Sequence, residues 1–237
     1  MISQSWQSHN QRNHSSDEDR KKDTMTDSTE LFDIMRTTRA MRRLKPDPVP
    51  DELIRRILEA GSYAANGGAN QRWRFLVVKD RSIKEQVQVW YKKAYDEVVG
   101  PRYANSAPPP GSSPGRYRRQ HDAVEYLTDH YHEAPVWIVA CMEGGDGLPD
   151  RALGASIYPA VQNMLLAARA LGLGSTLTSR HLMHAKEVEE ILGLPPGVYS
   201  YAILPIGYPM GNFGPVRRGP LSDVVFLDRW GERYLDE

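Results

Sequence analysis

The sequence predicts a mixed domain, α/β or α+β, in which strands alternate with helices. More residues are predicted to be helical than to lie in strands. Three observations carry this prediction. Apolar residues recur at helical spacing through residues 50–60. The runs 74–79 and 136–142 are apolar and of strand length. Residues 152–171 are rich in small residues and predict a long helix. Helices between strands indicate a sheet that helices cover.

The remaining elements follow in order. We predict further helices at 30–38, 82–99, 116–132 and 185–192, and a strand at 199–206. Residues 107–115 predict a loop, because proline, glycine and serine dominate them. Residues 1–28 are polar and charged and predict a disordered tail, since they cannot bury enough surface to offset the entropy of ordering. We therefore expect one folded domain at 29–237.

Composition excludes several classes of function. The formal net charge is zero, with 30 basic and 30 acidic residues, which argues against a nucleic-acid or membrane partner. The longest apolar run, 134–142, is too short to span a bilayer, and the N-terminus lacks a signal-peptide pattern, so we expect a cytoplasmic protein. Cys141 is the single cysteine, lies in an apolar strand pattern and is expected to be buried.

Histidine pairs at 130 and 132 and at 181 and 184 resemble metal-ligand spacing, but neither has a third ligand nearby in the sequence. We expect no metal site. A Rossmann glycine motif and a serine nucleophile elbow are both absent from the sequence.

Two segments on either side of the second predicted helix carry the strongest functional signal. The first is basic and contains Arg39, Arg42 and Arg43. The second, 64–75, joins a Gly-Gly pair to side-chain amides and runs into a strand. Guanidinium forks match phosphate oxygens and keep their charge, and glycines let a backbone approach a ring closely. Together the segments indicate a site for a flat, phosphorylated, hydrogen-bonding cofactor.

From residue 31 to about the C-terminus, the sequence resembles the FMN-dependent nitroreductase family. Four landmarks carry the resemblance, and together their order and spacing are specific. They are residues 38–44 for the family's RRSxRxF element, 65–73 for PSxxNxQPW, 162–175 for a long helix ending in GLGS, and Gly207-Tyr208-Pro209 followed by Arg217-Arg218.

The sequence also departs from the family pattern. Thr38 and Ala40 stand where an Arg and a Ser usually help to hold the phosphate, and Arg72 replaces a proline. The cofactor is therefore a firmer expectation than any individual contact.

The resemblance implies an α+β fold, with a central, mostly antiparallel sheet flanked by helices, in an intertwined homodimer. Two FMN molecules would lie at the subunit interface, with the tail after Pro209 around the partner and NAD(P)H as electron donor. The cofactor-binding residues that it implies are Thr38, Arg39, Ala40, Arg42, Asn66, Gly67, Asn70, Gln71, Leu177, Thr178, Ser179, Arg217 and Arg218. Arg39 and Arg218 would hold the phosphate with Arg217 as an auxiliary, and Arg42 would lie near the flavin N1/O2 edge.

Residues 88–131 correspond to the family's variable helical excursion over the substrate pocket. Aromatic residues that could line that pocket are Trp90, Tyr91, Tyr95, Tyr103 and Tyr117, about half of which we expect to be core residues. The implied function is an NAD(P)H oxidoreductase that reduces nitroaromatics, quinones or similar flat acceptors by ping-pong hydride transfer at flavin N5, without a catalytic side chain. Flavin fragmentation, dehalogenation, dehydrogenation and flavin binding without turnover stay open as alternatives.

Overall fold

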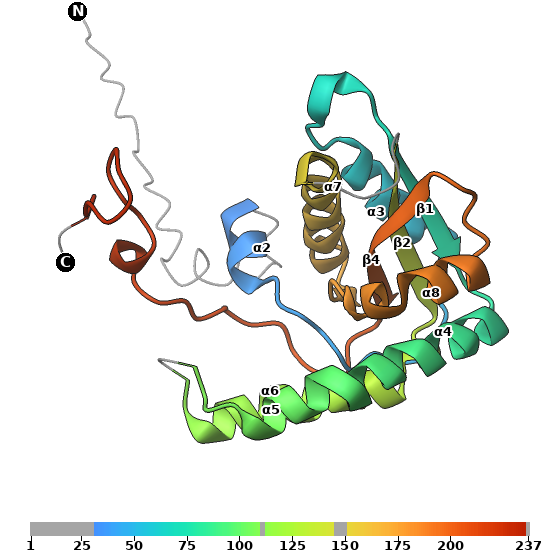
Figure 1. Cartoon of the computed structure of the whole chain (residues 1–237), viewed down its shortest axis with the longest axis horizontal. Helices are drawn as coiled ribbons and strands as arrows, with labels where there is room; N and C mark the ends of the chain where they lie inside the picture. The colour runs from blue at the N-terminus through green and yellow to red at the C-terminus, as the bar shows by residue number, and fades with distance from the viewer. Residues whose placement is uncertain (1–30, 110–111, 145–150, 236–237) are drawn as a thin grey trace, which may run out of the picture.

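A four-stranded antiparallel sheet forms the centre of the protein (Figure 1). The computed structural model describes residues 31–109, 112–144 and 151–235, so the tail predicted at 1–28 lies outside the described residues. The strands are β1 (Trp73–Val78), β2 (Val136–Glu143), β3 (Gly174–Ser175) and β4 (Val198–Gly207), in the order β1-β2-β4-β3. Every neighbouring pair is antiparallel, which confirms the α+β prediction.

Helices surround this sheet. They are α2 (Leu31–Thr37), α3 (Asp51–Ser62), α4 (Arg81–Ala94), α5 (Gly100–Asn105), α6 (Pro114–Asp129), α7 (Arg151–Ala170) and α8 (Ala185–Ile191). Short helical turns, some of them 3-10 helices, connect them: η1 (Gly67–Ala69), η2 (Tyr95–Val99), η3 (Tyr131–Glu133), η4 (Arg180–His184) and η5 (Leu221–Asp223).

Strand β2 is buried on both faces. Ile138 and Ala140 belong to the core beneath α3 and α7, whereas Trp137, Val139 and Cys141 belong to the core beneath α4 and α8. This alternation follows the two-residue period of a strand. Two covered faces explain why the sequence shows a continuous apolar run here. Cys141 is buried as predicted, and burial raises the pKa of its thiol to about 12.

The helical excursion between β1 and β2 is longer than the sequence predicts. After α4, the chain continues through the π-helical turn η2 into α5, where Pro101 is tolerated because the first turn leaves its N–H positions without intrahelical partners. Helix α6 begins inside the predicted loop, with Ser113 as its N-cap and Pro114 at its first position. The N-cap Ser113 and the following Pro114 therefore begin a helix within residues 107–115, whose composition had predicted a loop.

Helix α2 and the residues after β4 project from the helix-covered sheet (Figure 1). The two run side by side, since the Val216 N–H donates to the Arg36 carbonyl at 2.9 Å. Both expose large apolar side chains: Phe32 is 81% exposed and Trp230 90%. Within the described residues, no helix has the length and apolar character needed to cross a bilayer.

Candidate functional site

The basic segment 39–45 is fixed along an edge of the sheet. The Met41 N–H donates to the Ser175 carbonyl of β3 at 3.0 Å, and the side chains of Met41 and Leu44 are buried. A Cβ on Gly174 would lie 2.8 Å from a methyl carbon of Leu44, so only glycine permits this close approach. The buried residues of the segment thus hold its arginines at the surface.

The C-terminal segment returns to the same place. The guanidinium of Arg169 on α7 lies over the Phe213 ring, 4.3 Å from its centroid, which ties this segment to the body. The chain then passes beside α2 and brings Arg217 and Arg218 to the cavity that Arg39 lines. Arginines from opposite ends of the domain meet there, as the resemblance implies.

We call this site the arginine cavity; its volume is about 810 Å³. It is lined by Arg39, Ala40, Arg42, Arg116, Arg119, Gln120, Ala123, Pro215, Val216, Arg217 and Arg218. Among the residues that the structure describes, no Asp or Glu lines the cavity, and none of its six arginines forms a salt bridge. Like charges repel one another, so an anionic ligand would relieve an unfavourable arrangement.

Helix α6 supplies two of these arginines, which the sequence did not single out. Arg116, Arg119, Gln120 and Ala123 have the spacing i, i+3, i+4 and i+7, which places them on one face of the helix. This spacing was the signal available in the sequence. The helix predicted at 116–132 includes these residues, but their spacing alone does not show that this face of the helix meets the other arginines.

A smaller cavity adjoins the arginine cavity and shares Arg42 with it. We call it the aromatic cavity; its volume is about 280 Å³, and it is lined by Arg42, Tyr91, Val99, Tyr103, Val124, Leu127, Thr176, Leu177, Thr178, Ser179, Arg180 and Met183. Burial lowers the pKa of Arg42 from its ordinary value, but a guanidinium remains charged at neutral pH. Arg42 therefore presents a positive charge where the two cavities meet.

The inner wall of the aromatic cavity is a stack of rings. Tyr91 stacks on Tyr131 with 4.0 Å between the centroids, and the Arg180 guanidinium lies 4.2 Å from the Tyr91 centroid. Arg180 also donates to the Thr128 hydroxyl at 2.6 Å. The Tyr131 hydroxyl lies 2.6 Å from Thr178 Oγ1. This wall is rigid, flat and cationic, and Arg180 is a cavity residue that the sequence analysis missed.

The aromatic cavity is also lined by residues whose backbone amides are free to bind a ligand. The Thr178 N–H is used in the sheet, where it donates to the Ile203 carbonyl at 3.0 Å. Leu177 and Ser179 also line the cavity, and neither of their amides makes a hydrogen bond within the described part of the chain. Of the three residues that the resemblance implies here, these two can offer a backbone donor.

Thr38 and three of the five aromatic residues that the resemblance implies do not line either of these two cavities. The Thr38 hydroxyl donates to the Ile34 carbonyl at 2.6 Å and helps to end α2. Tyr91 and Tyr103 line the aromatic cavity, whereas Trp90, Tyr95 and Tyr117 are not among its lining residues. Tyr103 and Tyr117 contact each other with 5.8 Å between their centroids.

Residues 66–71, which we call the amide turn, contain Asn66, Gly67, Asn70 and Gln71. Asn66 Oδ1 accepts from the Gln71 N–H at 3.0 Å, and the Gly67 N–H donates to Ser156 Oγ on α7 at 3.1 Å. The turn lines neither cavity, and in Figure 1 it lies above the sheet while α5 and α6 lie below it. One chain therefore does not bring the amide turn to the arginines.

The amide turn is also strained. Gly68 has a φ of 62°, which glycine adopts freely, but Ala69 and Gln71 have φ values of 54° and 47°. The left-handed conformation costs an L-residue about 1–2 kcal/mol. Such strain persists where surrounding contacts impose a backbone shape, and it is frequent at ligand sites.

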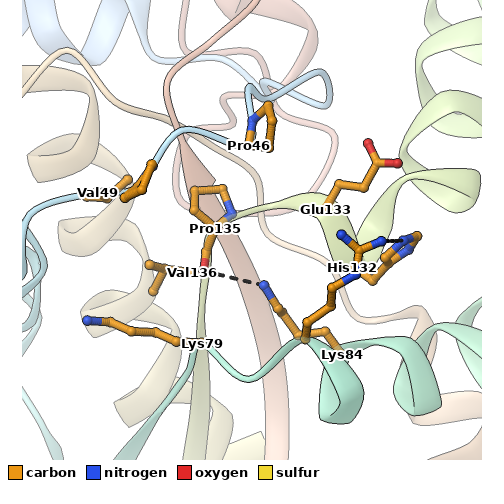
Figure 2. Close-up of a pocket in the computed structure, with 10 residues that line it drawn as sticks. Pro46, Val49, Lys79, Lys84, His132, Glu133, Pro135 and Val136 are labelled. Carbon is orange, nitrogen blue, oxygen red and sulfur yellow. Dashed lines mark hydrogen bonds between the residues drawn. The ribbon is translucent and has the colours of Figure 1, made fainter.

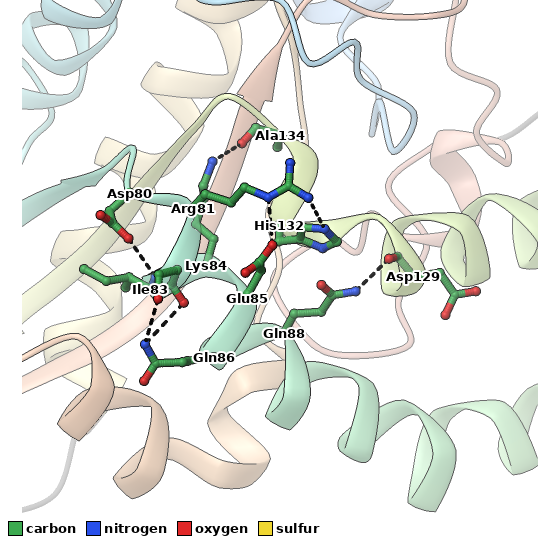
Figure 3. Close-up of polar contacts among 11 residues, drawn as sticks. Asp80, Arg81, Ile83, Lys84, Glu85, Gln86, Gln88, Asp129, His132 and Ala134 are labelled. Atoms are coloured by element: carbon green, nitrogen blue, oxygen red, sulfur yellow. Dashed lines mark hydrogen bonds and ion pairs between the residues drawn. The ribbon is translucent and has the colours of Figure 1, made fainter.

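A third cavity, of about 600 Å³, lies at the N-terminal end of α4 (Figure 2). Its charges are already partnered: Arg81 pairs with Glu85 at 2.7 Å and also contacts His132 (Figure 3). Lys84 is buried, which lowers its pKa, and its ammonium donates to a backbone carbonyl at 2.7 Å. Unlike the arginine cavity, this one holds few unpaired charges for a ligand. No cluster of potential metal ligands occurs among the described residues.

The chain is similar in sequence and fold to several known proteins. An NADH dehydrogenase of Thermus thermophilus is 30% identical over 197 residues, which cover 79% of this chain and 90% of that protein. An iodotyrosine deiodinase of Daphnia pulex is 26% identical over 216 residues, covering 86% and 67%. The crystal structure of a nitroreductase with bound FMN from Desulfitobacterium hafniense superposes with a TM-score of 0.61 at 19% identity, covering 83% and 97%, and shows the same fold.

The sequence profile described as "Nitroreductase family" matches residues 35–208. The match includes the basic segment, the amide turn and both walls of the aromatic cavity. Because it spans most of the domain, the chain belongs to the nitroreductase family.

Proposed function

We propose that the protein is a homodimeric, FMN-dependent oxidoreductase that takes electrons from NAD(P)H and reduces nitroaromatics, quinones or similar flat acceptors. One observation carries this proposal: a cavity whose six arginines form no salt bridge with any described residue joins an aromatic cavity at the half-buried guanidinium of Arg42. That pair of cavities suits a ligand with a phosphate at one end and a ring at the other.

The donor set fits FMN. Arg39 and Arg218, with Arg217 beside them, would hold the phosphate, because guanidinium forks match its oxygens. Arg42 would face the pyrimidine edge of the ring and favour negative charge there. The free amides of Leu177 and Ser179 are donors of the kind that a flavin edge requires. When bound, FMN supplies the chemistry: it accepts a hydride from NAD(P)H and passes two electrons to the acceptor.

The side chains of this chain position the reactants. The stacked rings of Tyr91 and Tyr131 give the cavity a rigid wall, and Tyr103 lines the same space. Such a slot orients a flat donor or acceptor and excludes water from it. Hydride transfer needs no dedicated acid or base from the protein. A single slot used in turn by donor and acceptor predicts ping-pong kinetics.

A second copy of the chain would complete the site. The amide turn carries residues that the resemblance assigns to the flavin edge, yet it lies away from the arginine cavity within one chain. The projecting segments expose Phe32 and Trp230, and exposed apolar side chains of this size indicate a protein contact. In a two-fold dimer, each chain would offer its amide turn to the arginines of the other.

Reductive dehalogenation is the second candidate function. The similarity to the Daphnia pulex iodotyrosine deiodinase, over 86% of this chain, favours it among the alternatives. The arginines would hold FMN in the same way, and only the acceptor would change.

The absorbance spectrum of the purified protein is the first test, since bound flavin gives a yellow protein. Anaerobic mixing with NADPH or NADH should bleach that absorbance, and a nitroaromatic should then restore it. Restoration by an iodinated phenol with release of iodide would instead favour dehalogenation. A yellow protein that neither donor bleaches would indicate flavin binding without turnover, and a protein that stays colourless after addition of excess FMN would refute the proposal.

A further inference from the structure

The arginine cavity contains more positive charge than one FMN phosphate can neutralise. Six guanidiniums line it, and no acidic residue does so in the described part of the chain. A phosphomonoester such as that of FMN brings a charge of about −1.5 to −2 at neutral pH. About four positive charges therefore remain, of which one is that of Arg42 at the proposed flavin edge. A flat nitroaromatic or quinone is uncharged and gives no reason for them.

The positive charges that the FMN phosphate does not neutralise include two on helix α6. Arg39, Arg217 and Arg218 lie on the basic segment and the C-terminal segment, where the resemblance implies the flavin phosphate. Arg116 and Arg119 instead lie on α6, on the face that lines the cavity, and both are exposed and without an acidic partner among the described residues. We call these two residues the α6 stripe.

We propose that the α6 stripe binds the 2′-phosphate of NADPH, so that the enzyme prefers NADPH to NADH. This inference rests on the proposed function, because the nicotinamide donor must enter the site that holds FMN. NADPH and NADH differ by one phosphomonoester on the adenosine ribose. Two guanidiniums one helical turn apart can bind that dianion in a forked arrangement, whereas NADH offers them no equivalent group.

The cavity size and field agree with this assignment. A volume of about 810 Å³ is at the upper end of ordinary ligand pockets, which leaves room for a second phosphate group beside the first. A concentrated positive field also attracts an anionic donor from solution, and this attraction weakens as salt rises. The preference for NADPH should therefore decrease with ionic strength.

The test compares three forms of the full-length holoenzyme: wild type, Arg116→Ala/Arg119→Ala and Arg118→Ala. Arg118 is the matched control, because it lies on the same helix but does not line the cavity. Bound FMN is first measured by absorbance in each form. Calorimetry then measures binding of 2′,5′-ADP and 5′-ADP, which differ in the phosphate at issue. Finally, kcat/KM is measured with NADPH and with NADH.

We expect wild type and Arg118→Ala to bind 2′,5′-ADP at least about tenfold more tightly than 5′-ADP and to prefer NADPH by a similar factor. The double variant should keep its FMN and lose both preferences, because its kcat/KM should fall by about tenfold more with NADPH than with NADH. Equal binding of the two nucleotides by wild type would overturn the inference. So would a double variant that keeps the NADPH preference, or one that loses FMN, since the stripe would then belong to the flavin phosphate. A colourless wild-type protein would instead refute the proposed function, and nucleotide binding would still report on the stripe.

Discussion

The arginine cavity and the amide turn were both singled out by the sequence, yet they lie in very different surroundings. The arginines converge within one chain, because the basic segment is fastened to β3 and the C-terminal segment returns beside α2. The amide turn is fastened to α7 through Ser156 and lies above the sheet, away from the arginines (Figure 1). The arginines therefore meet within a single chain, whereas the amide turn lies apart from them and would act on the second chain's site in the proposed dimer.

In the proposed dimer, this difference would divide the site between the two subunits. The charged half can gather its parts through backbone hydrogen bonds and buried residues of the same chain. The neutral half is a strained turn that presents amides outwards. We infer that flavin affinity comes mainly from the arginines, whereas the turn orients the ring and links binding to dimer formation.

The largest expected effect is on FMN retention. Replacement of Arg39 and Arg218 by alanine removes two charge-assisted contacts, each worth about 1.5–3 kcal/mol, and should weaken FMN binding about a thousandfold. Fluorescence titration of the released flavin measures this. Arg118→Ala is the control, because Arg118 lies on α6 but does not line the cavity. Comparable affinity in the double variant and the control would show that these arginines do not hold the phosphate.

The next effect is a decrease in the free energy of unfolding at acid pH, caused by His181. His181 in η4 is fully buried, with Nε2 3.2 Å from Ser200 Oγ, and burial lowers its pKa to about 4. The unfolded chain binds a proton near the ordinary pKa of 6.5, above the folded value. This contribution to the free energy of unfolding is therefore complete above pH 6.5 and decreases as the pH falls towards 4, by about 3 kcal/mol in all.

Urea denaturation of wild type and His181→Gln at several pH values between 7 and 4 tests this. The variant should show a shallower pH dependence across that window. Identical slopes for the two proteins would mean that His181 is not the group responsible.

A smaller effect is expected in the amide turn. Ala69→Gly relieves a left-handed backbone and should raise the free energy of unfolding by about 1 kcal/mol. Ala65→Gly, at a neighbouring exposed position without a positive φ, should have no such benefit. Thermal unfolding of the two variants measures the difference. Equal melting temperatures would indicate that the turn is not strained at Ala69.

The sequence predicted the sheet and its helices well, because apolar periodicity and continuous apolar runs report burial directly. It also identified four of the six arginines that line the cavity, namely Arg39, Arg42, Arg217 and Arg218, because the family motifs that contain them can be read from the sequence alone. It could not identify Arg180, because that residue reaches the aromatic wall only through the packing of η4 against α4. The helix predicted at 116–132 contains Arg116 and Arg119, but the sequence could not show that this helix lies beside the basic segment, because only the folded chain brings α6 to the arginine cavity.

The sequence also could not show that the basic segment and the amide turn are separated in space within one chain. Residues 39–42 and 66–71 are separated by one helix, which suggests proximity, but α3 carries the chain to the other end of the sheet. Proximity along the chain is a poor guide where a second chain can complete the site.

A mixed dimer tests most directly whether the site is divided between two chains. One subunit carries Arg39→Ala/Arg218→Ala, the other carries Asn66→Ala/Gln71→Ala, and different affinity tags isolate the mixed species. If each site takes arginines from one chain and the turn from the other, one site receives both defects and the other receives neither. The mixed dimer should then bind one FMN with wild-type affinity. Two weakened sites, one without its arginines and one with the altered turn, and none with wild-type affinity, would show instead that a single chain supplies both regions.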